Sequence, residues 1–197
     1  MEPRKIMAFI DGENLVFRYQ SMKDKGFTPQ PGVFHEIDTY VWSNFVPVPP
    51  DHSLIRANYY TSVVGDDLKI DSVCTDMKKM EIRGTYTWSL GGNRSLQYGQ
   101  NLYPLAFKKP SKSNKTKIVD IRMTVDILTN VYQGNVDSVY LLSGDGDYEE
   151  VIREVMRRGK QIYIGAFSDG LSPKLKNLCD GFIDLDSFFF KPQSGAG

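Results

Sequence analysis

The chain alternates between short apolar runs and longer stretches in which apolar residues recur at helical spacing. The apolar runs have the length of buried strands, and turn-forming residues separate them from the amphipathic stretches. Strands are expected at residues 6–10, 54–64, 139–142, 161–167 and 182–185. Because strands that alternate with helices form parallel sheets with crossover connections, the pattern predicts an α/β fold with three layers and a mainly parallel sheet.

The stretches between the strands carry the helical pattern. Helices are expected around residues 15–19, 33–45, 68–80, 120–132, 147–158 and 171–178. In the fourth of these, the apolar positions include Ile121, Val125, Leu128 and Tyr132. The less regular stretch 83–110 is expected to contain only strand pieces around a turn at Gly91-Gly92-Asn93.

Length and composition bound the organisation of the chain. With 197 residues and 41% hydrophobic content, it is long enough for one substantial core. We therefore expect a single domain over residues 1–190 and a disordered tail at 191–197. The 24 basic and 24 acidic residues balance, so the net charge points to no class of partner. No apolar run has the length of a signal peptide or a membrane span, which favours a soluble, cytoplasmic protein without membrane contact.

Aspartates follow two of the predicted strands. Asp11 ends the first, and Asp145 and Asp147 lie just beyond the strand at 139–142. Asp120 opens the helix that leads into that strand. If the two strands are neighbours, three segments bring acids to the carboxyl edge of the sheet, where open α/β sheets bind ligands. Asp145 or Asp147 alone could be a helix cap, but a cap needs only one carboxylate and the second adds repulsion.

A cluster of buried aspartates favours a divalent cation, which neutralises their mutual repulsion. Oxygen ligands without His or Cys select Mg²⁺ or Mn²⁺. Such a cation activates water and stabilises the charge that develops on a phosphodiester during in-line displacement. The aspartates therefore predict metal-assisted phosphodiester hydrolysis.

Five segments, in this order, resemble the NYN family of PIN-like ribonucleases, in its bacterial LabA-like branch. They are FIDGENL at 9–15, the run 117–126, SVYLLSGDGDYEEVI at 138–152, GKQIYIGAF at 159–167 and LSPKLKNLCDGFIDL at 171–185. The resemblance covers roughly residues 5–187 and implies a PIN-like sheet and a metal-dependent nuclease acting on RNA. Ile118 stands where the family commonly has glycine, and residues 91–116 are longer and more basic than the family requires.

Position by position, the resemblance implies five catalytic residues. These are the metal-site acids and a polar helper beside the first of them: Asp11, Asp120, Asp145, Asp147 and Asn14. Asp126 also matches the family pattern as a metal ligand. It ranks lower because helical geometry turns it about 240° from Asp120.

Two groups of residues are candidates for substrate binding. The lysine segment, residues 108–117, has no acid and is expected to be an exposed loop that gathers phosphates or is merely solvated. Its lysines are Lys108, Lys109, Lys112, Lys115 and Lys117. Arg94 lies among Tyr86, Trp88, Tyr98 and Tyr103, aromatics that could stack on unpaired bases or fill an edge of the core.

These observations favour a ribonuclease, with single-stranded RNA preferred as the substrate. A regulatory RNA- or protein-binding module that retains a metal site but turns over little remains the alternative. A haloacid-dehalogenase-like phosphatase would need Asp-x-Asp after the first strand, where this chain has Glu13. The sequence leaves open whether the chain forms a homo-oligomer.

Overall fold

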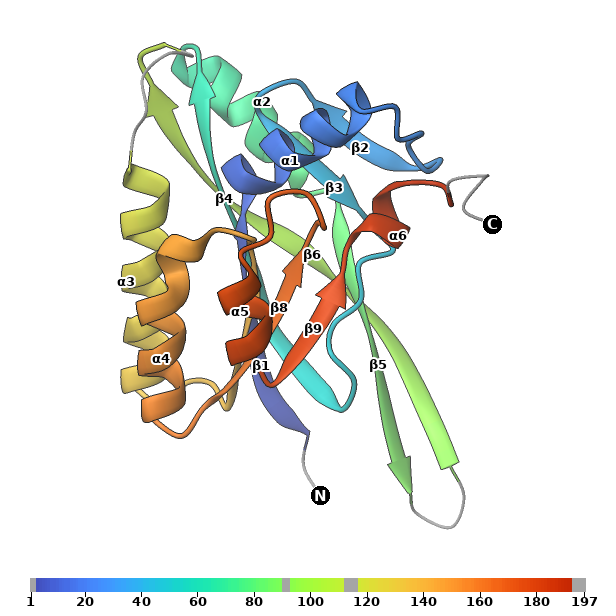
Figure 1. Ribbon diagram of the computed structural model, residues 1–197, viewed down its shortest axis with the longest axis vertical. Helices are drawn as coiled ribbons and strands as arrows, with labels where there is room; N and C mark the ends of the chain where they lie inside the picture. Colours follow the sequence, from blue (N-terminus) through green and yellow to red (C-terminus); the bar gives the residue numbers. More distant parts are fainter. Residues whose placement is uncertain (1–2, 90–92, 112–116, 193–197) are drawn as a thin grey trace.

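The computed structural model describes residues 3–89, 93–111 and 117–192, with backbone alone for 86–89, 93 and 94. Within these ranges the main sheet has seven strands, in the order β5-β6-β4-β1-β7-β8-β9 (Figure 1). Their bounds are β1 Arg4–Asp11, β4 His52–Val64, β5 Glu81–Ser89, β6 Asn93–Lys109, β7 Ser138–Leu142, β8 Gln161–Ala166 and β9 Gly181–Asp184. Neighbouring strands are parallel except β5 and β6. The expected three-layer α/β fold is confirmed.

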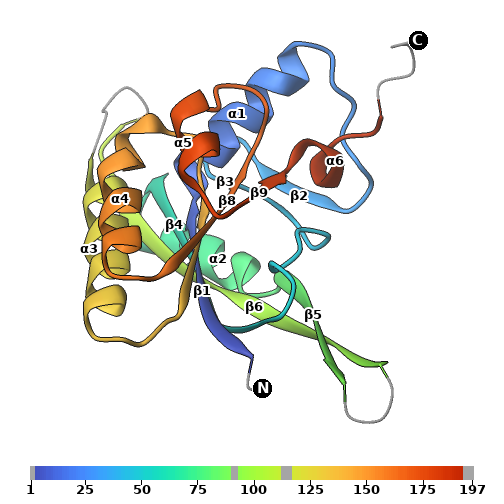
Figure 2. The same cartoon turned by 60° about the horizontal axis from the view of Figure 1, so that its bottom comes forward.

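Helices cover both faces of the sheet, as Figures 1 and 2 show from two directions. The helices are α1 Gly12–Asp24, α2 Asp67–Met77, α3 Ile118–Tyr132, the short 3₁₀ turn η1 Gly146–Tyr148, α4 Glu149–Arg157, α5 Pro173–Leu178 and α6 Asp186–Phe189. None of them, within the described ranges, is long and apolar enough to cross a membrane.

Strand β1 divides the core into two layers by simple alternation. Ile6 and Ile10 pack with α1, α2 and α6, whereas Met7 and Phe9 pack with α3, α4 and α5. Successive side chains of a strand point to opposite faces, so a continuous apolar run is what a strand buried on both faces requires. The central position of β1 thus follows from its sequence.

The prediction of a helix at residues 33–45 is wrong. The segment forms an antiparallel hairpin of β2 Val33–Glu36 and β3 Tyr40–Ser43. Asp38 in the connecting turn has φ of 55°, a left-handed conformation that ends the strand pairing in a tight turn. Aromatic and β-branched residues suit a strand surface, and this preference outweighs their accidental helical spacing.

The prediction of which face of α3 is buried is also wrong. The buried positions are Val119, Met123, Ile127 and Val131, while the expected Ile121, Val125 and Tyr132 are exposed. Both sets have helical spacing, and only the packing against the sheet decides between them.

The stretch 83–110 is more regular than expected, because β5 and β6 form a long antiparallel hairpin that extends beyond the body of the sheet (Figures 1 and 2). Strand β6 continues to Lys109, so the expected exposed loop does not begin at Lys108. Lys112 and Lys115 lie outside the described residues, as do Gly91 and Gly92 of the expected turn and residues 193–197 of the expected tail. The short helix α6 was not anticipated from the sequence.

Candidate active site

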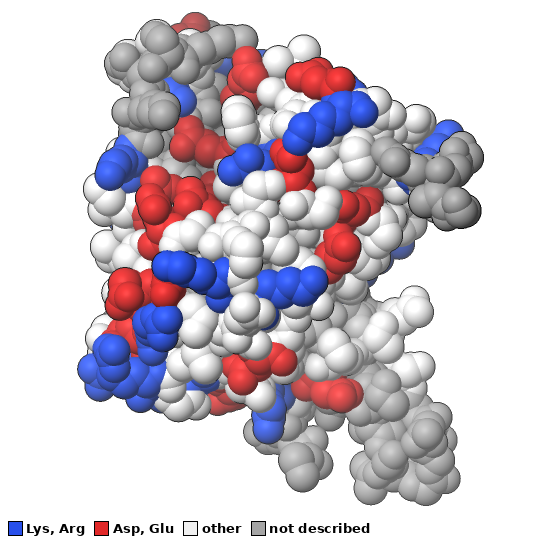
Figure 3. Space-filling view, in the orientation of Figure 1, with Lys and Arg blue, Asp and Glu red and all other residues white. Residues whose placement is uncertain are grey.

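The carboxyl ends of β1 and β7 lie side by side, with Ile10 paired to Leu142. A pocket of about 800 Å³ opens at this edge of the sheet. It is lined by all five residues implied as catalytic, among others, and we call it the acidic pocket: Asp11, Asn14, Asp120, Asp145 and Asp147. Figure 3 shows acidic side chains gathered between the upper ends of α3 and α4 and the start of α1.

Asp11 forms the floor of the acidic pocket and is only 2% exposed. Its Oδ1 accepts the backbone N–H of Asn14 at 3.0 Å, which caps α1, and its Oδ2 accepts the hydroxyl of Ser143 at 3.0 Å. Burial raises the pKa of this carboxyl to about 7, although both hydrogen bonds oppose the rise. Gly12 lets α1 begin against β4, since a Cβ at this position would lie 2.3 Å from the ring of Tyr59.

Asp145 is both a cap and a residue of the pocket. Its Oδ1 accepts the backbone N–H of Asp147 at 3.0 Å, which begins η1. The loop before it is held by two further bonds: Gly144 N–H donates to Asn14 Oδ1 at 3.2 Å, and Asp145 N–H donates to Ser143 Oγ at 3.2 Å. The loop after β7 is therefore fixed against the start of α1.

Asp120 reaches the acidic pocket from the first turn of α3, on the opposite side from α1. The hydroxyl of Tyr148 donates a hydrogen bond to its Oδ1 at 3.2 Å. Partial burial raises the pKa of Asp120, and the negative charges of Glu13, Asp145 and Asp147 raise it further. The negative charges around Asp120 therefore disfavour its ionised form.

Asp126 does not join the other acids. Its Oδ2 accepts the hydroxyl of Tyr60 at 3.0 Å and pairs with Nε of Arg122 at 3.1 Å, and it does not line the acidic pocket. The reason is the helical rotation that already ranked it below Asp120. In this structure its contacts are those of a side chain that ties α3 to β4.

Glu13 is a pocket residue that the sequence analysis assigned no role. The hydroxyl of Ser62 donates to its carboxylate, and Lys109 Nζ lies 3.5 Å from its Oε1. Lys109 and Lys117 line the acidic pocket, whereas Lys108 pairs with Asp67 at 2.9 Å outside it. Glu13 lies in the first turn of α1, where an acidic residue is common, so only the fold reveals its position in the pocket.

Two of the four aromatics expected to stack on bases or to fill an edge of the core, Tyr98 and Tyr103, have described side chains, and neither lines the acidic pocket. The hydroxyl of Tyr98 donates to the carbonyl of His52 at 2.9 Å and accepts Leu54 N–H at 3.1 Å, a contact that anchors the hairpin. Tyr103 carries Arg56 over its ring at 5.0 Å and does not line the pocket. The side chains of Tyr86, Trp88 and Arg94 lie outside the described part of the structure.

The acidic pocket fits a hard divalent cation in its chemistry. All of its candidate ligands are oxygen donors, and burial with mutual repulsion raises the pKa of Asp11 and Asp120, a cost that a bound cation removes. Among the described residues, no three His, Cys, Asp or Glu side chains are close enough together to form a preassembled metal site. The side chains would have to move inward to share one ion.

Comparison with known protein families gives a match across nearly the whole chain. The family model of the NYN domain matches residues 5–186. An uncharacterized protein of Methanocaldococcus jannaschii is 31% identical over 71 residues, which are 36% of this chain and 30% of that protein. The low amplitude and bright protein LabA of Synechococcus elongatus is 39% identical over 70 residues, which are 34% of this chain and 36% of LabA. The matched segments thus span about a third of the length of these relatives.

A solved structure has a similar fold. It is a Vibrio parahaemolyticus protein of unknown function, with a TM-score of 0.59 and 16% sequence identity. The similarity covers 96% of this chain and 98% of that protein. At this identity the comparison supports the architecture alone.

Proposed function

The chain belongs to the NYN domain family, and from this premise we propose that it is a metal-dependent ribonuclease that hydrolyses phosphodiester bonds in single-stranded RNA. The family is associated with nuclease and RNA-related functions. One observation carries the proposal: aspartates from β1, α3 and the loop after β7 line one pocket at the carboxyl edge of the sheet. Acids with a purely structural role are not expected to lie together at one edge of the sheet, because their like charges repel one another.

In this proposal the cation is Mg²⁺ or Mn²⁺, held by Asp11, Asp120, Asp145 and Asp147. When bound, it would polarise the phosphodiester and lower the pKa of an attacking water. Ser143 keeps the Asp11 carboxylate oriented toward the pocket. The amide oxygen of Asn14 accepts a hydrogen bond from the N–H of Gly144. The amide N–H groups of Asn14 could therefore donate to a phosphate oxygen.

The positive charges of the pocket have a separate role. Lys109 and Lys117 line it, and in the proposed complex they attract the phosphates on either side of the scissile bond. Lys109 is only 18% exposed and is held near Glu13. A lysine fixed in this way loses less side-chain entropy on binding than a freely exposed one.

The test is incubation of the purified chain with single-stranded and duplex RNA and DNA, in Mn²⁺, in Mg²⁺ or in chelator. The proposal expects cleavage of single-stranded RNA that requires the metal and is lost in the Asp145→Asn variant. The variant controls for a contaminating nuclease, since a contaminant would cut equally in both preparations. Absence of metal-dependent cleavage at high protein concentration would contradict the proposal.

A second function has one observation in its favour. The acids line the pocket without forming a preassembled group of three ligands among the described residues. This arrangement suits a regulatory module that binds RNA or a protein and turns over little. RNA binding that persists in the absence of any cleavage would favour this module over the enzyme.

A further inference from the structure

Three exposed apolar side chains line the acidic pocket. Phe17, Ile37 and Val64 are 61%, 68% and 41% exposed, and all three line it. They come from α1, from the turn between β2 and β3, and from the end of β4. Single exposed apolar residues are ordinary, but three from separate elements around one polar pocket form a patch that suits a ligand. We call these three residues the apolar wall.

Phe17 lies between two polar anchors on the same face of α1. Glu13, Phe17 and Gln20 follow one another at helical spacing, so their side chains project in the same direction. Glu13 binds Ser62 and lies near Lys109 at the acidic end. At the other end, Gln20 accepts the N–H of Asp38 at 2.9 Å and donates to its carboxylate at 3.0 Å. Gln20 thereby holds the turn that presents Ile37 beside the pocket.

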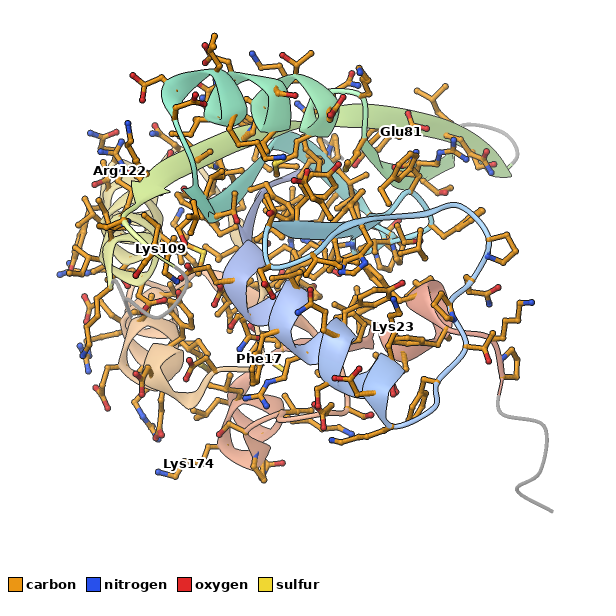
Figure 4. The ribbon with its side chains drawn as sticks, turned by 90° about the horizontal axis from the view of Figure 1, so that it is seen from above. Phe17, Lys23, Glu81, Lys109, Arg122 and Lys174 are labelled. Atoms are coloured by element: carbon orange, nitrogen blue, oxygen red, sulfur yellow. The ribbon has the colours of Figure 1, made fainter. Side chains whose placement is uncertain are left out.

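The ring of Phe17 is supported from one side by a cation. The Cζ of Arg18 lies 5.2 Å from the ring centroid. The guanidinium also lies against Gly170, where a Cβ would come within 2.0 Å of Cζ. Arg18 therefore has a fixed position that the loop before α5 provides. Figure 4 looks onto this edge of the sheet, with Phe17 on α1 and Lys109 near the start of α3.

We propose that Phe17, flanked by Ile37 and Val64, stacks on one unpaired base of the strand whose phosphate lies at the aspartates. The inference rests on the proposed function and specifies its substrate. The side chains of the apolar wall have no charge that could bind a phosphate and no hydrogen-bond donor that could bind the edge of a base. Phe17, however, has a flat aromatic ring. Every base has a face that can stack on such a ring, whereas a paired base is already stacked on both faces. The wall thus selects single strands with little sequence preference.

The experiment measures binding separately from cleavage. Affinity for a fluorescent six-nucleotide RNA is measured by anisotropy in the Asp145→Asn background, so that the strand is not cut. The same measurement uses a strand of equal length and charge in which every base is replaced by hydrogen. Phe17→Ala is compared with Phe45→Ala, which removes a ring that is 59% exposed and lies outside the acidic pocket.

Phe17→Ala should weaken binding of the base-bearing strand about tenfold to a hundredfold. It should leave binding of the abasic strand unchanged, and Phe45→Ala should change neither. In a Phe17→Trp variant, the new indole should be quenched by the base-bearing strand alone, after subtraction of the signal from Trp42 and Trp88.

Equal weakening of both strands by Phe17→Ala, or no weakening of either, would overturn the stacking proposal. A change of oligomeric state in Phe17→Ala, seen by sedimentation, would assign the wall to a second copy of the chain and would also overturn it. The two proposals fail separately. Stacking without metal-dependent cleavage in the wild-type chain would remove the nuclease and keep the base site, whereas cleavage with unaltered binding by Phe17→Ala would do the reverse.

Discussion

Ser143 donates a hydrogen bond to the carboxylate of Asp11 at 3.0 Å, across 132 positions of the sequence. Asp11 ends β1 and Ser143 follows the neighbouring parallel strand β7, so the bond holds the two strands together at the edge where the acids gather. It also leaves Asp11 with one oxygen bound to Ser143 and the other to the N–H of Asn14. These two hydrogen bonds fix the orientation of the buried carboxylate, so in the proposed metal site Asp11 would be an acid whose position is set by the fold before a cation binds.

Asp145 provides a test that separates its two roles. Asp145→Asn keeps an oxygen for the N–H of Asp147 but removes the charge, so it should leave the free energy of unfolding nearly unchanged. Metal-dependent cleavage should fall by about a hundredfold or more, beyond what loss of an outer partner of a metal ligand costs. Asp145→Ala should in addition destabilise the fold by about 1 kcal/mol. Urea titrations and cleavage rates check both, and a fully active, folded Asp145→Asn variant would leave Asp145 as a cap alone.

Metal should stabilise the fold through Asp11. Millimolar Mg²⁺ or Mn²⁺ that binds only the folded protein increases the free energy of unfolding by mass action, by about 2.7 kcal/mol at a hundredfold excess over Kd, and so raises the melting temperature. Asp11→Asn should melt at a higher temperature than wild type in chelator, because it removes a buried charge, and should gain less from metal. Asp71→Asn, at an exposed acid of α2, is the matched control and should behave as wild type. Equal gains in the wild type and Asp11→Asn would place Asp11 outside the metal site.

The pKa of Asp11 also predicts how stability depends on pH in chelator. Burial raises this pKa from 3.8 to about 7, so between these values the folded protein holds a proton that the unfolded chain has released. The free energy of unfolding should therefore fall as pH rises from about 4 to about 7, by on the order of 3 kcal/mol at most. The difference between wild type and Asp11→Asn isolates this group from the histidines. A difference that does not vary with pH would contradict the raised pKa.

Much of the fold could be predicted from the sequence, because short apolar runs indicate the buried strands and the residues directly after them indicate the edge of the sheet. A short continuous apolar run such as 6–10, bounded by turn residues, predicts a strand buried on both faces, and Asp11 at its end is then expected at the carboxyl edge of the sheet. Local rules fail where two patterns compete. Residues 33–45 satisfy helical spacing and strand propensity at once, and α3 carries two apolar stripes of which only that of Met123 meets the sheet.

The residues of the acidic pocket that the sequence indicated are its four aspartates, Asn14 and two of the five lysines, Lys109 and Lys117. An aspartate next to the end of a predicted strand or the start of a predicted helix can be placed at the edge of the sheet from the sequence alone. Four aspartates could therefore be assigned to the candidate site before the structure. Phe17 and Ile37 carry no such signal. In the sequence both match the apolar pattern of a predicted helix, so they are expected to be buried in the core. The position of Ile37 beside the pocket depends on Gln20, which joins α1 to the β2–β3 turn through Asp38, a contact between distant segments that the spacing of apolar residues does not predict.

Lys109 and Lys108 offer an internal comparison, because successive residues of β6 point to opposite faces. Lys109 lines the acidic pocket near Glu13, while Lys108 pairs with Asp67 outside it. Lys109→Gln should therefore weaken binding of single-stranded RNA and lower the slope of log K against log salt by about 0.7, the share of one phosphate contact.

Lys108→Gln removes the same charge from the adjacent position and should change neither quantity, since an exposed ion pair contributes little. Affinity measured between low and moderate salt distinguishes the two variants, and melting temperatures show that both fold. The weakening by Lys109→Gln should be similar for RNAs of different sequence, because phosphate contacts position a strand without reading it. Equal effects of the two substitutions would mean that the lysines act only through net charge, and the strand would then have to reach the aspartates without Lys109.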